Sequence, residues 1–248
     1  MTEYDVFSRF YDGLMNDVDY KAKTEYALSL FESFDKKPSL LLDVGCGTGG
    51  FSLEFAQNGI DVIGADISEG MLFKASERAK ELGLDILFLN QSAAELDLYG
   101  TVDGAVCFMD TVNHIVSKKE LQKSFDKISL FLEKDRLFIF DVNTVYKHEQ
   151  ILKDNSFVLE NEDVFCVWQN FYDKRNKITD ISLDFFEKQN DNYMRYHDEF
   201  SERAYTNEIL CEMLKKSGFK VEAIYGEDSY KKPSKTTERN IFITRKVR

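Results

Sequence analysis

The sequence has few of the residues that metal and disulfide sites require. It contains four cysteines and three histidines, with no C-x-x-C pair and no histidine at metal-ligand spacing. A structural zinc is therefore not expected, and we predict no metal site. The thiols of Cys46, Cys107, Cys166 and Cys211 are interpreted as reduced and mostly buried.

Runs of one kind of residue are also missing. Lys and Arg total 32 against 44 Asp and Glu, a net charge of −12, and no basic block is long enough to follow a phosphate backbone. Nucleic acid is therefore not expected as a partner. No apolar run approaches the roughly 20 residues of a membrane span, and the acidic start MTEYDVFSRFYD is unlike a signal peptide. We predict a soluble, cytoplasmic protein that makes no membrane contact. Its oligomeric state is not predicted.

The sequence does contain enough apolar surface for a packed core. Hydrophobic residues make up 43% of the chain and aromatic residues 14%, which is sufficient to offset the entropy of ordering it. A length of 248 residues fits one large α/β domain, or a core domain with a substantial insertion.

Short apolar runs alternate with amphipathic helices over the first part of the chain. After a helix at 20–34, strands are expected at 39–44, 61–66, 84–89, 102–108 and 136–142, and helices at 50–58, 69–82 and 118–132. Strands that alternate with helices in this way predict a parallel, doubly wound sheet.

The pattern changes after Asn143. Strand-like runs at 157–172, 178–186 and 193–203 have no helix between them, which predicts an inserted antiparallel meander of three strands. A helix at 206–216, strands at 220–225 and 240–245, and a polar loop at 226–239 complete the chain. We therefore expect an α/β domain formed by 1–143 and 204–248, with a β insertion at 144–203.

One glycine motif suggests a nucleotide-like ligand. In the stretch LLLDVGCGTGG at 40–50, Gly45, Gly47 and Gly50 match G-x-G-x-x-G after a buried strand. Glycines let the backbone turn tightly against a ligand, and the next helix offers free N–H groups. The motif alone is compatible with a dinucleotide, with another nucleoside cofactor, or with a tight turn.

Two carboxylates narrow these choices. Asp43 ends the first strand just where a dinucleotide places its pyrophosphate, and two anions there would repel each other, so a cofactor with a cationic amino group fits better. Asp66 ends the next strand, where a carboxylate can accept hydrogen bonds from ribose hydroxyls. The alternative for Asp66 is a helix cap before Ser68.

At this point a family resemblance is clear. DVGCGTG at 43–49 and GADIS at 64–68 resemble the first two motifs of class I S-adenosylmethionine (SAM)-dependent methyltransferases. The chain is similar in particular to small bacterial members with a YD-containing N-terminal segment and an antiparallel insertion after strand five. The resemblance implies a Rossmann-like doubly wound seven-stranded sheet whose last strand is antiparallel, SAM as cofactor, and a small-molecule acceptor bound under the insertion as a lid.

The resemblance also implies a set of cofactor residues. Asp43 and the loop amides would hold the methionine end, Asp66 the ribose, and Ile67 and Met71 the adenine. Ser92 stands where the family often has an adenine-binding Asp. The full predicted set is Tyr11, Tyr20, Asp43, Gly45, Cys46, Gly47, Gly49, Asp66, Ile67, Met71, Gln91, Ser92, Ala93, Phe108 and Met109. Within it, Tyr11 and Tyr20 belong to an N-terminal segment expected to fold over the cofactor.

Acceptor residues are predicted from the loop after strand four and from the insertion. The candidates for acceptor binding are Asp110, Asn113, Asn143, Trp168 and Arg203. His114 and His197 are candidate bases, which are needed only if the acceptor loses a proton. Each has a structural alternative: helix capping or packing in the loop, core packing for Trp168, and a solvated sheet face for His197.

The sequence therefore predicts a SAM-dependent methyltransferase that moves a methyl group to a small molecule by in-line displacement. Two other functions remain open at this point. One is a protein that binds SAM or its demethylated product without catalysis. The other is an NAD(P)-dependent oxidoreductase, which the same glycines permit.

Overall fold

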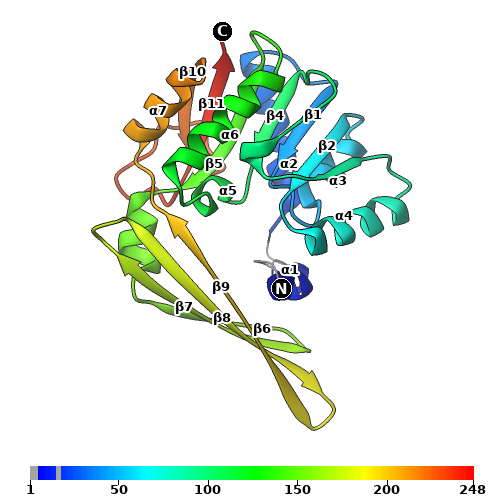
Figure 1. Ribbon diagram of the computed structural model, residues 1–248, viewed down its shortest axis with the longest axis vertical. Helices are drawn as coiled ribbons and strands as arrows, with labels where there is room; N and C mark the ends of the chain where they lie inside the picture. Colours follow the sequence, from blue (N-terminus) through cyan, green and yellow to red (C-terminus); the bar gives the residue numbers. More distant parts are fainter. Residues whose placement is uncertain (1–4, 15–17) are drawn as a thin grey trace.

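The computed structural model describes residues 5–14 and 18–248. A large sheet covered by helices forms one part of the molecule, and a long, narrow second sheet extends away from it (Figure 1). Helix α1 (Asp5–Leu14) lies between the second sheet and α4 (Glu69–Glu81) (Figure 1). Within the described residues, the length and hydropathy needed to cross a bilayer do not occur together in any helix.

The main sheet has seven strands in the order β10-β11-β5-β4-β1-β2-β3. All of its pairings are parallel except those of β11, which runs antiparallel to both β5 and β10. The predicted doubly wound sheet with an antiparallel last strand is thus confirmed. The strands are β1 (Leu40–Val44), β2 (Asp61–Asp66), β3 (Leu87–Asn90), β4 (Gly104–Cys107), β5 (Leu137–Asn143), β10 (Phe219–Gly226) and β11 (Arg239–Lys246).

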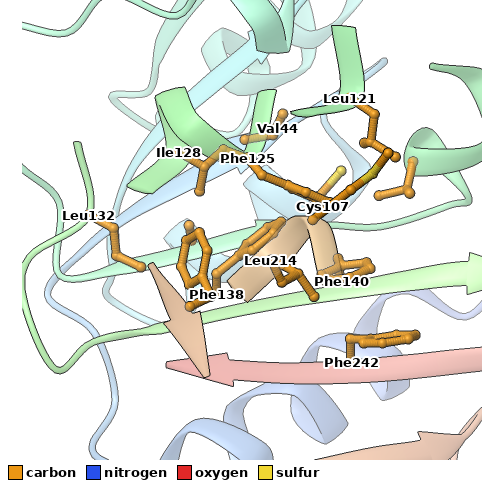
Figure 2. Close-up of a cluster of buried hydrophobic side chains, with 14 of the residues drawn as sticks. Val44, Cys107, Leu121, Phe125, Ile128, Leu132, Phe138, Phe140, Leu214 and Phe242 are labelled. Carbon is orange, nitrogen blue, oxygen red and sulfur yellow. The ribbon is translucent and has the colours of Figure 1, made fainter. Parts of the chain in front are cut away.

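Helices cover both faces of this sheet, because each strand presents apolar side chains on two sides. On one face, α2 (Tyr20–Phe34) and α3 (Gly50–Gln57) bury residues such as Phe31 and Phe55. On the other, α6 (Lys118–Phe131) and α7 (Asn207–Lys216) pack on Phe138, Phe140 and Phe242 (Figure 2).

Side-chain caps fix where several helices begin. Ser68, Ser117 and Thr206 each accept a hydrogen bond from the backbone amide three residues later. The cap of α4 is therefore Ser68. This removes the alternative in which Asp66 served as the helix cap.

The second sheet is antiparallel, as predicted, but it has four strands where three were expected. The predicted run at 157–172 is broken at Asn161, whose Oδ1 accepts the amides of Asp163 at 3.0 Å and Val164 at 2.9 Å. This turn folds the run back on itself, since an Asn side chain can replace a backbone acceptor. The strands are β6 (Ser156–Glu160), β7 (Val164–Asp173), β8 (Ile178–Gln189) and β9 (Asn192–Arg203).

Three short helical elements were not predicted. These are the 3₁₀ turn η1 (Ala93–Glu95), the one-turn helix α5 (Thr111–His114) and the π-helix η2 (Lys147–Leu152). They are too short to show a hydrophobic period. Two of them, α5 and η2, follow β4 and β5 at the edge of the sheet where ligands bind in doubly wound folds.

Candidate functional site

The loop after β1 is shaped by three glycines with positive φ. Gly45, Gly47 and Gly49 have φ of +72°, +55° and +81°. The amides of Gly45 and Cys46 both donate to the Ala65 carbonyl, at 2.7 and 3.1 Å, which fastens the loop to the end of β2. Glycine adopts this left-handed conformation without the penalty that other residues incur.

A residue with a side chain at position 45 would also clash with Thr111. A Cβ atom built at Gly45 would lie 2.3 Å from Cγ2 of Thr111, a contact that no real side chain makes. The glycine loop and α5 are therefore in direct contact. Gly50 makes room for the ring of Tyr20, which a Cβ would meet at 2.4 Å.

A narrow pocket lies where the carboxyl ends of β1 and β4 meet. Two aromatic contacts form one side of it: the ring of Phe51 packs 5.2 Å from Tyr20 and 4.9 Å from Phe108. Eight predicted cofactor residues line the pocket, namely Tyr11, Tyr20, Asp43, Gly45, Cys46, Gly47, Phe108 and Met109. Thr48, Gly50 and Phe51 line it as well and were not in the predicted set. The motif itself could have indicated them, since they continue its loop into α3.

Asp43 lies at the base of this pocket. Its side chain is buried, and Oδ2 accepts a 2.5 Å hydrogen bond from the Ser52 hydroxyl. Burial raises the pKa of Asp43 to about 7, although the hydrogen bond from Ser52 opposes the shift. A cationic group placed beside this carboxyl would favour its ionised form.

Asp66 is held by backbone amides. Its Oδ2 accepts the amide of Gly47 and its Oδ1 the amide of Ser68, both at 2.9 Å. Burial raises the pKa of Asp66, and these hydrogen bonds oppose that effect. Next to it, Ile67 is 63% exposed, whereas Met71 is buried against α1 and the second sheet.

The predicted adenine segment has other partners. The side-chain amide of Gln91 accepts the Asp97 amide at 3.0 Å, Ser92 donates to Glu95 at 3.2 Å, and Ala93 starts η1. None of these three residues is among those that line the pocket in the described part of the chain. Asn90, which was not predicted, donates to the Ile67 carbonyl at 2.9 Å and fixes the end of β2.

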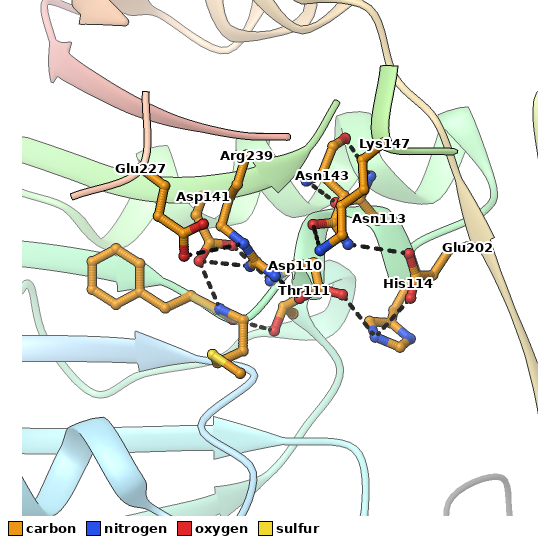
Figure 3. A network of polar contacts seen from close by, with 12 residues as sticks. Asp110, Thr111, Asn113, His114, Asp141, Asn143, Lys147, Glu202, Glu227 and Arg239 are labelled. Atoms are coloured by element: carbon orange, nitrogen blue, oxygen red, sulfur yellow. Dashed lines mark hydrogen bonds and ion pairs between the residues drawn. The ribbon is translucent and has the colours of Figure 1, made fainter. Parts of the chain in front are cut away.

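The loop after β4 is strained and tightly held. Met109 and Asp110 have φ of 55° and 52°, which is unusual for residues other than glycine. The carboxylate of Asp141 accepts both of their amides, at 3.0 and 2.6 Å. Arg239 lies between the two acids, with Nη2 2.8 Å from Asp110 Oδ1 and Nη1 3.0 Å from Asp141 Oδ2 (Figure 3).

Charges in this loop are buried but compensated. Arg239 holds the pKa of Asp110 well below its usual range, despite the opposing effect of burial. Burial raises the pKa of Asp141, and the two acids raise the pKa of Arg239. Removing one partner of such a buried ion pair strongly destabilises the folded protein, because the other charge is left buried without compensation.

His114 ends α5 beside a second buried acid. Its Nε2 lies 3.8 Å from Asp110 Oδ2 and 3.8 Å from Oε1 of Glu202, which comes from β9 (Figure 3). The ring also packs on Phe200 at 5.1 Å. Burial lowers the pKa of His114. Burial also raises the pKa of Glu202, to about 8, and the negative charge of the nearby Asp110 adds to that increase.

Asn113, a predicted acceptor residue, is fully enclosed. Its Nδ2 donates to the carbonyls of Asn143 and Arg203, at 3.1 and 2.9 Å, and its Oδ1 accepts the Asn143 amide at 2.9 Å. The side chain is thus a clip that joins α5, β5 and β9. A direct contact between this amide and an acceptor does not fit such burial.

Three other predicted acceptor residues also have structural partners. The Arg203 guanidinium donates to the carbonyls of Val116 and Asn176, at 2.6 and 2.7 Å. Trp168 lies in β7 and donates to Asn170 at 2.7 Å. Asn143 is buried at the end of β5, close to Glu202 and Lys147.

The structure does not bring His197 to the pocket. His197 is 46% exposed at its side chain and pairs with Asp184 at 3.0 Å. Because side chains alternate along a strand, it lies on the face of β9 opposite to Phe200 and Glu202. Of the two predicted bases, only His114 lies beside the loop after β4.

Several residues around the site were not predicted. Asp141 could have been noticed as an acid inside the apolar run LFIFDVN. Glu202 and Arg239 gave no comparable signal, because each lies in a polar stretch and finds its partners across the fold.

Helix α1 connects the second sheet to the pocket. The Phe7 amide donates to Asp198 at 2.8 Å, Arg9 pairs with Glu187 at 2.7 Å, and Phe10 stacks on Phe185 at 4.7 Å. On its other side, Tyr11 lines the pocket.

Comparisons with known proteins agree with this geometry. A family described as "Methyltransferase domain" matches residues 41–135. YqeM of Bacillus subtilis (strain 168), assigned as a methyltransferase, is 30% identical over 246 residues, which cover 98% of this chain and 97% of YqeM. A relative from Geobacillus sp. (strain WCH70) with the same assignment is 30% identical over 245 residues, 98% of this chain and 99% of its own.

Solved structures give the same result. The crystal structure of a SAM-dependent methyltransferase from Clostridium acetobutylicum ATCC 824 has a TM-score of 0.89, 28% identity and 99% coverage of both chains. CalS10 from Micromonospora echinaspora, an amino pentose methyltransferase with SAM bound, shares the fold at a TM-score of 0.78 and 17% identity, with 100% of this chain and 99% of CalS10 covered. The chain therefore belongs to the class I SAM-dependent methyltransferases.

Proposed function

We propose that this methyltransferase transfers the methyl group to a small-molecule acceptor by direct in-line displacement. The observation that carries the proposal is the pocket at the ends of β1 and β4, closed on one side by Met109 of the strained loop after β4. The second sheet and α1 would form the lid over the acceptor. An NAD(P)-dependent oxidoreductase and a binding protein without catalysis are not favoured by the relatives.

The residues of the pocket fit SAM. A Cβ at Gly47 would meet nothing within 4 Å, so the wall of the loop there is open to a ligand. The buried carboxyl of Asp43 suits an ammonium group. Asp66 does not line the pocket but is bonded to Gly47, which does, and it retains lone pairs for ribose hydroxyls beyond its two amide contacts. When bound, SAM supplies a methyl group made electrophilic by its sulfonium.

The protein's own contribution is mainly alignment. Holding two reactants in line can supply about 7–11 kcal/mol of the barrier. Asp141 and Arg239 would serve this purpose as positioning residues, because they fix the backbone of Met109 and Asp110. Direct displacement requires a base only for an acceptor that loses a proton; where no ion occupies its Nε2, geometry favours His114 over His197 for that role.

The acceptor class is supported by relatives and by charge. A glycine/sarcosine N-methyltransferase of Halorhodospira halochloris is 28% identical over 132 residues, and a magnesium-protoporphyrin O-methyltransferase of Synechocystis sp. 32% over 124. The names of both proteins describe small acceptors. A net charge of −12 disfavours a nucleic-acid acceptor, since binding to phosphates relies on basic groups.

The test is methyl transfer from labelled SAM into a cell extract that has been separated by size. We expect label in the small-molecule fraction, and label only in protein or nucleic acid would contradict the proposal. Asp66→Ala serves as a control that weakens SAM binding by about 1–3 kcal/mol in calorimetry, through lost hydrogen bonds to a charged acceptor. An unchanged affinity would remove Asp66 from the cofactor site.

A further inference from the structure

Three groups able to bind a metal ion meet at one point, although they are far apart in the sequence. One ligand atom from each of Asp110, His114 and Glu202 lies within 4.8 Å of the other two. His114 Nε2 is 3.8 Å from Asp110 Oδ2 and 3.8 Å from Glu202 Oε1 (Figure 3). These distances are too long for hydrogen bonds. They suit a shared ion, because two ligands each about 2.0–2.6 Å from one ion can be no more than about 4–5 Å apart.

One carboxylate oxygen in this cluster has no hydrogen-bond donor among the described residues. The Glu202 side chain is 3% exposed, and its Oε2 faces Asn143 Nδ2 at 3.4 Å. Its Oε1 accepts no hydrogen bond from the residues that the structure describes. A carboxylate on a side chain this deeply enclosed normally has a donor or a cation beside each oxygen. Glu202 Oε1 is therefore the oxygen of this carboxylate that is available to a ligand.

The remaining oxygens of both carboxylates are already held in place. Asp110 Oδ1 receives Arg239 Nη2 at 2.8 Å, which leaves Oδ2 directed at His114. Asn143 Nδ2 contacts Glu202 Oε2 in the same manner, which leaves Oε1 directed at His114. Partners of this kind orient metal ligands in known sites, and they are needed to keep each ligand atom directed at the ion.

The elements that carry the three ligands are also fixed to one another. Asp110 and His114 are four residues apart at the two ends of α5, so they share one face of that turn. The Asn113 side chain donates to the Arg203 carbonyl at 2.9 Å, next to Glu202, and so ties α5 to β9. The ligand positions are thus set before any ion arrives.

We propose that Asp110 Oδ2, His114 Nε2 and Glu202 Oε1 bind one divalent first-row transition ion, such as Mn²⁺ or Zn²⁺. Two carboxylates balance the charge of the ion, and an imidazole nitrogen favours these metals over Mg²⁺ and Ca²⁺, which prefer oxygen ligands alone. Three protein ligands leave coordination positions open for water or an acceptor. Asp110 directly follows Met109 of the pocket wall, so the ion would lie close to the pocket.

The proposal is tested with Mn²⁺ on the whole protein, purified without a histidine tag and treated with a chelator. Electron paramagnetic resonance measures free Mn²⁺ as the protein is titrated. We expect one Mn²⁺ bound per chain, with displacement by Zn²⁺. His114→Ala and Glu202→Gln should each weaken binding at least tenfold, because each removes a ligand.

His197→Ala is the matched control, since this exposed histidine also pairs with acids but lies on the other face of β9. It should leave Mn²⁺ binding unchanged. Circular dichroism and SAM calorimetry on both ligand variants separate the loss of a site from the loss of the fold. Absence of saturable Mn²⁺ and Zn²⁺ binding, or binding that survives both ligand substitutions, overturns the proposal. Failure of the proposed small-molecule transfer would leave the Mn²⁺ titration unaffected, so the two can fail separately.

Discussion

Two acidic regions, the glycine loop and the loop after β4, both contribute residues to the pocket, and their buried charges are stabilised by different means. In the glycine loop, Asp43 and Asp66 accept hydrogen bonds from Ser52 and from backbone amides that lie 2 to 19 residues away in the chain. In the loop after β4, Asp110 relies on Arg239, 129 residues away. The first region is built from one local segment, whereas the second exists only once β5, β9 and β11 have assembled around it.

This difference predicts where the fold is most sensitive. Substitutions in the cluster after β4 remove charge compensation that nothing local can replace. Substitutions in the glycine loop act on backbone conformation and on cofactor binding, with smaller effects on stability.

The largest effect is expected for Arg239→Met. The substitution keeps much of the side-chain volume but leaves Asp110 and Asp141 buried together without a counter-charge. Breaking a buried ion pair in this way costs about 3–5 kcal/mol. Urea unfolding of the purified variant measures the loss.

Arg195→Met is the matched control for this experiment. Arg195 pairs with Asp184 at 2.7 Å, but its side chain is 62% exposed, so we expect a change of about 0–1 kcal/mol. Equal losses for the two variants would contradict the contrast between the regions.

The next effect is expected for Gly45→Ala. The alanine would have to adopt a left-handed backbone conformation, and its Cβ would overlap Thr111. Together these effects should lower the free energy of unfolding by about 2–4 kcal/mol. At Gly47 a Cβ has open space, so Gly47→Ala should cost only the conformational part, about 1–2 kcal/mol.

A double variant identifies the cause of the Gly45 effect. Thr111→Ala removes the Cγ2 and Oγ1 atoms that the new Cβ would meet, and should restore part of the stability lost in Gly45→Ala. Strict additivity of the two substitutions would show that the contact between the loop and α5 does not matter.

A smaller effect, on binding, is expected for Asp43→Asn. Loss of a charged partner for the amino group of SAM should weaken binding by about 1.5–3 kcal/mol. Calorimetry with SAM measures this loss. Asp61→Asn, an exposed site at the start of β2, is the control and should leave the affinity unchanged.

The same carboxyl gives a pH dependence with a definite sign. Its folded pKa of about 7 lies above the ordinary value of 3.8, so Asp43 contributes stability at low pH that is lost as the pH rises through about 7. Since the ammonium of SAM favours the ionised form, affinity should increase between pH 6 and pH 8. Asp43→Asn should remove most of that increase, and an unchanged slope would show that another group titrates.

The contrast between the regions also explains what the sequence could predict. The helix at 20–34 and the strand at 61–66 match the structure at both ends, because hydrophobic period and turn residues are local signals. The pocket residues Asp43, Gly45, Cys46 and Gly47 were found for the same reason, since one continuous motif forms the loop.

The errors have two origins, one local and one in contacts between distant elements. The strand count in the insertion was wrong because a single Asn161 turn broke an otherwise uniform run. Glu202 and Arg239 were missed because their significance lies in contacts between distant elements. Spacing along the chain could not bring Asp110, His114 and Glu202 together either, because only the packing of β9 against α5 does so.

The smallest effect is expected for His197→Ala, and it tests the assignment of faces on β9. His197 pairs with Asp184 on the exposed side of the second sheet, so its removal should change the free energy of unfolding by about 0–1 kcal/mol. Methyl transfer should be unchanged, because Phe200 and Glu202, the residues of β9 that contact His114, lie on the other face of the strand. The assay compares His197→Ala with Glu202→Gln at equal protein concentration. A loss of transfer in His197→Ala as large as in Glu202→Gln would mean that both faces of β9 serve the reaction, and would end the contrast between an inner, functional face and an outer, solvated one.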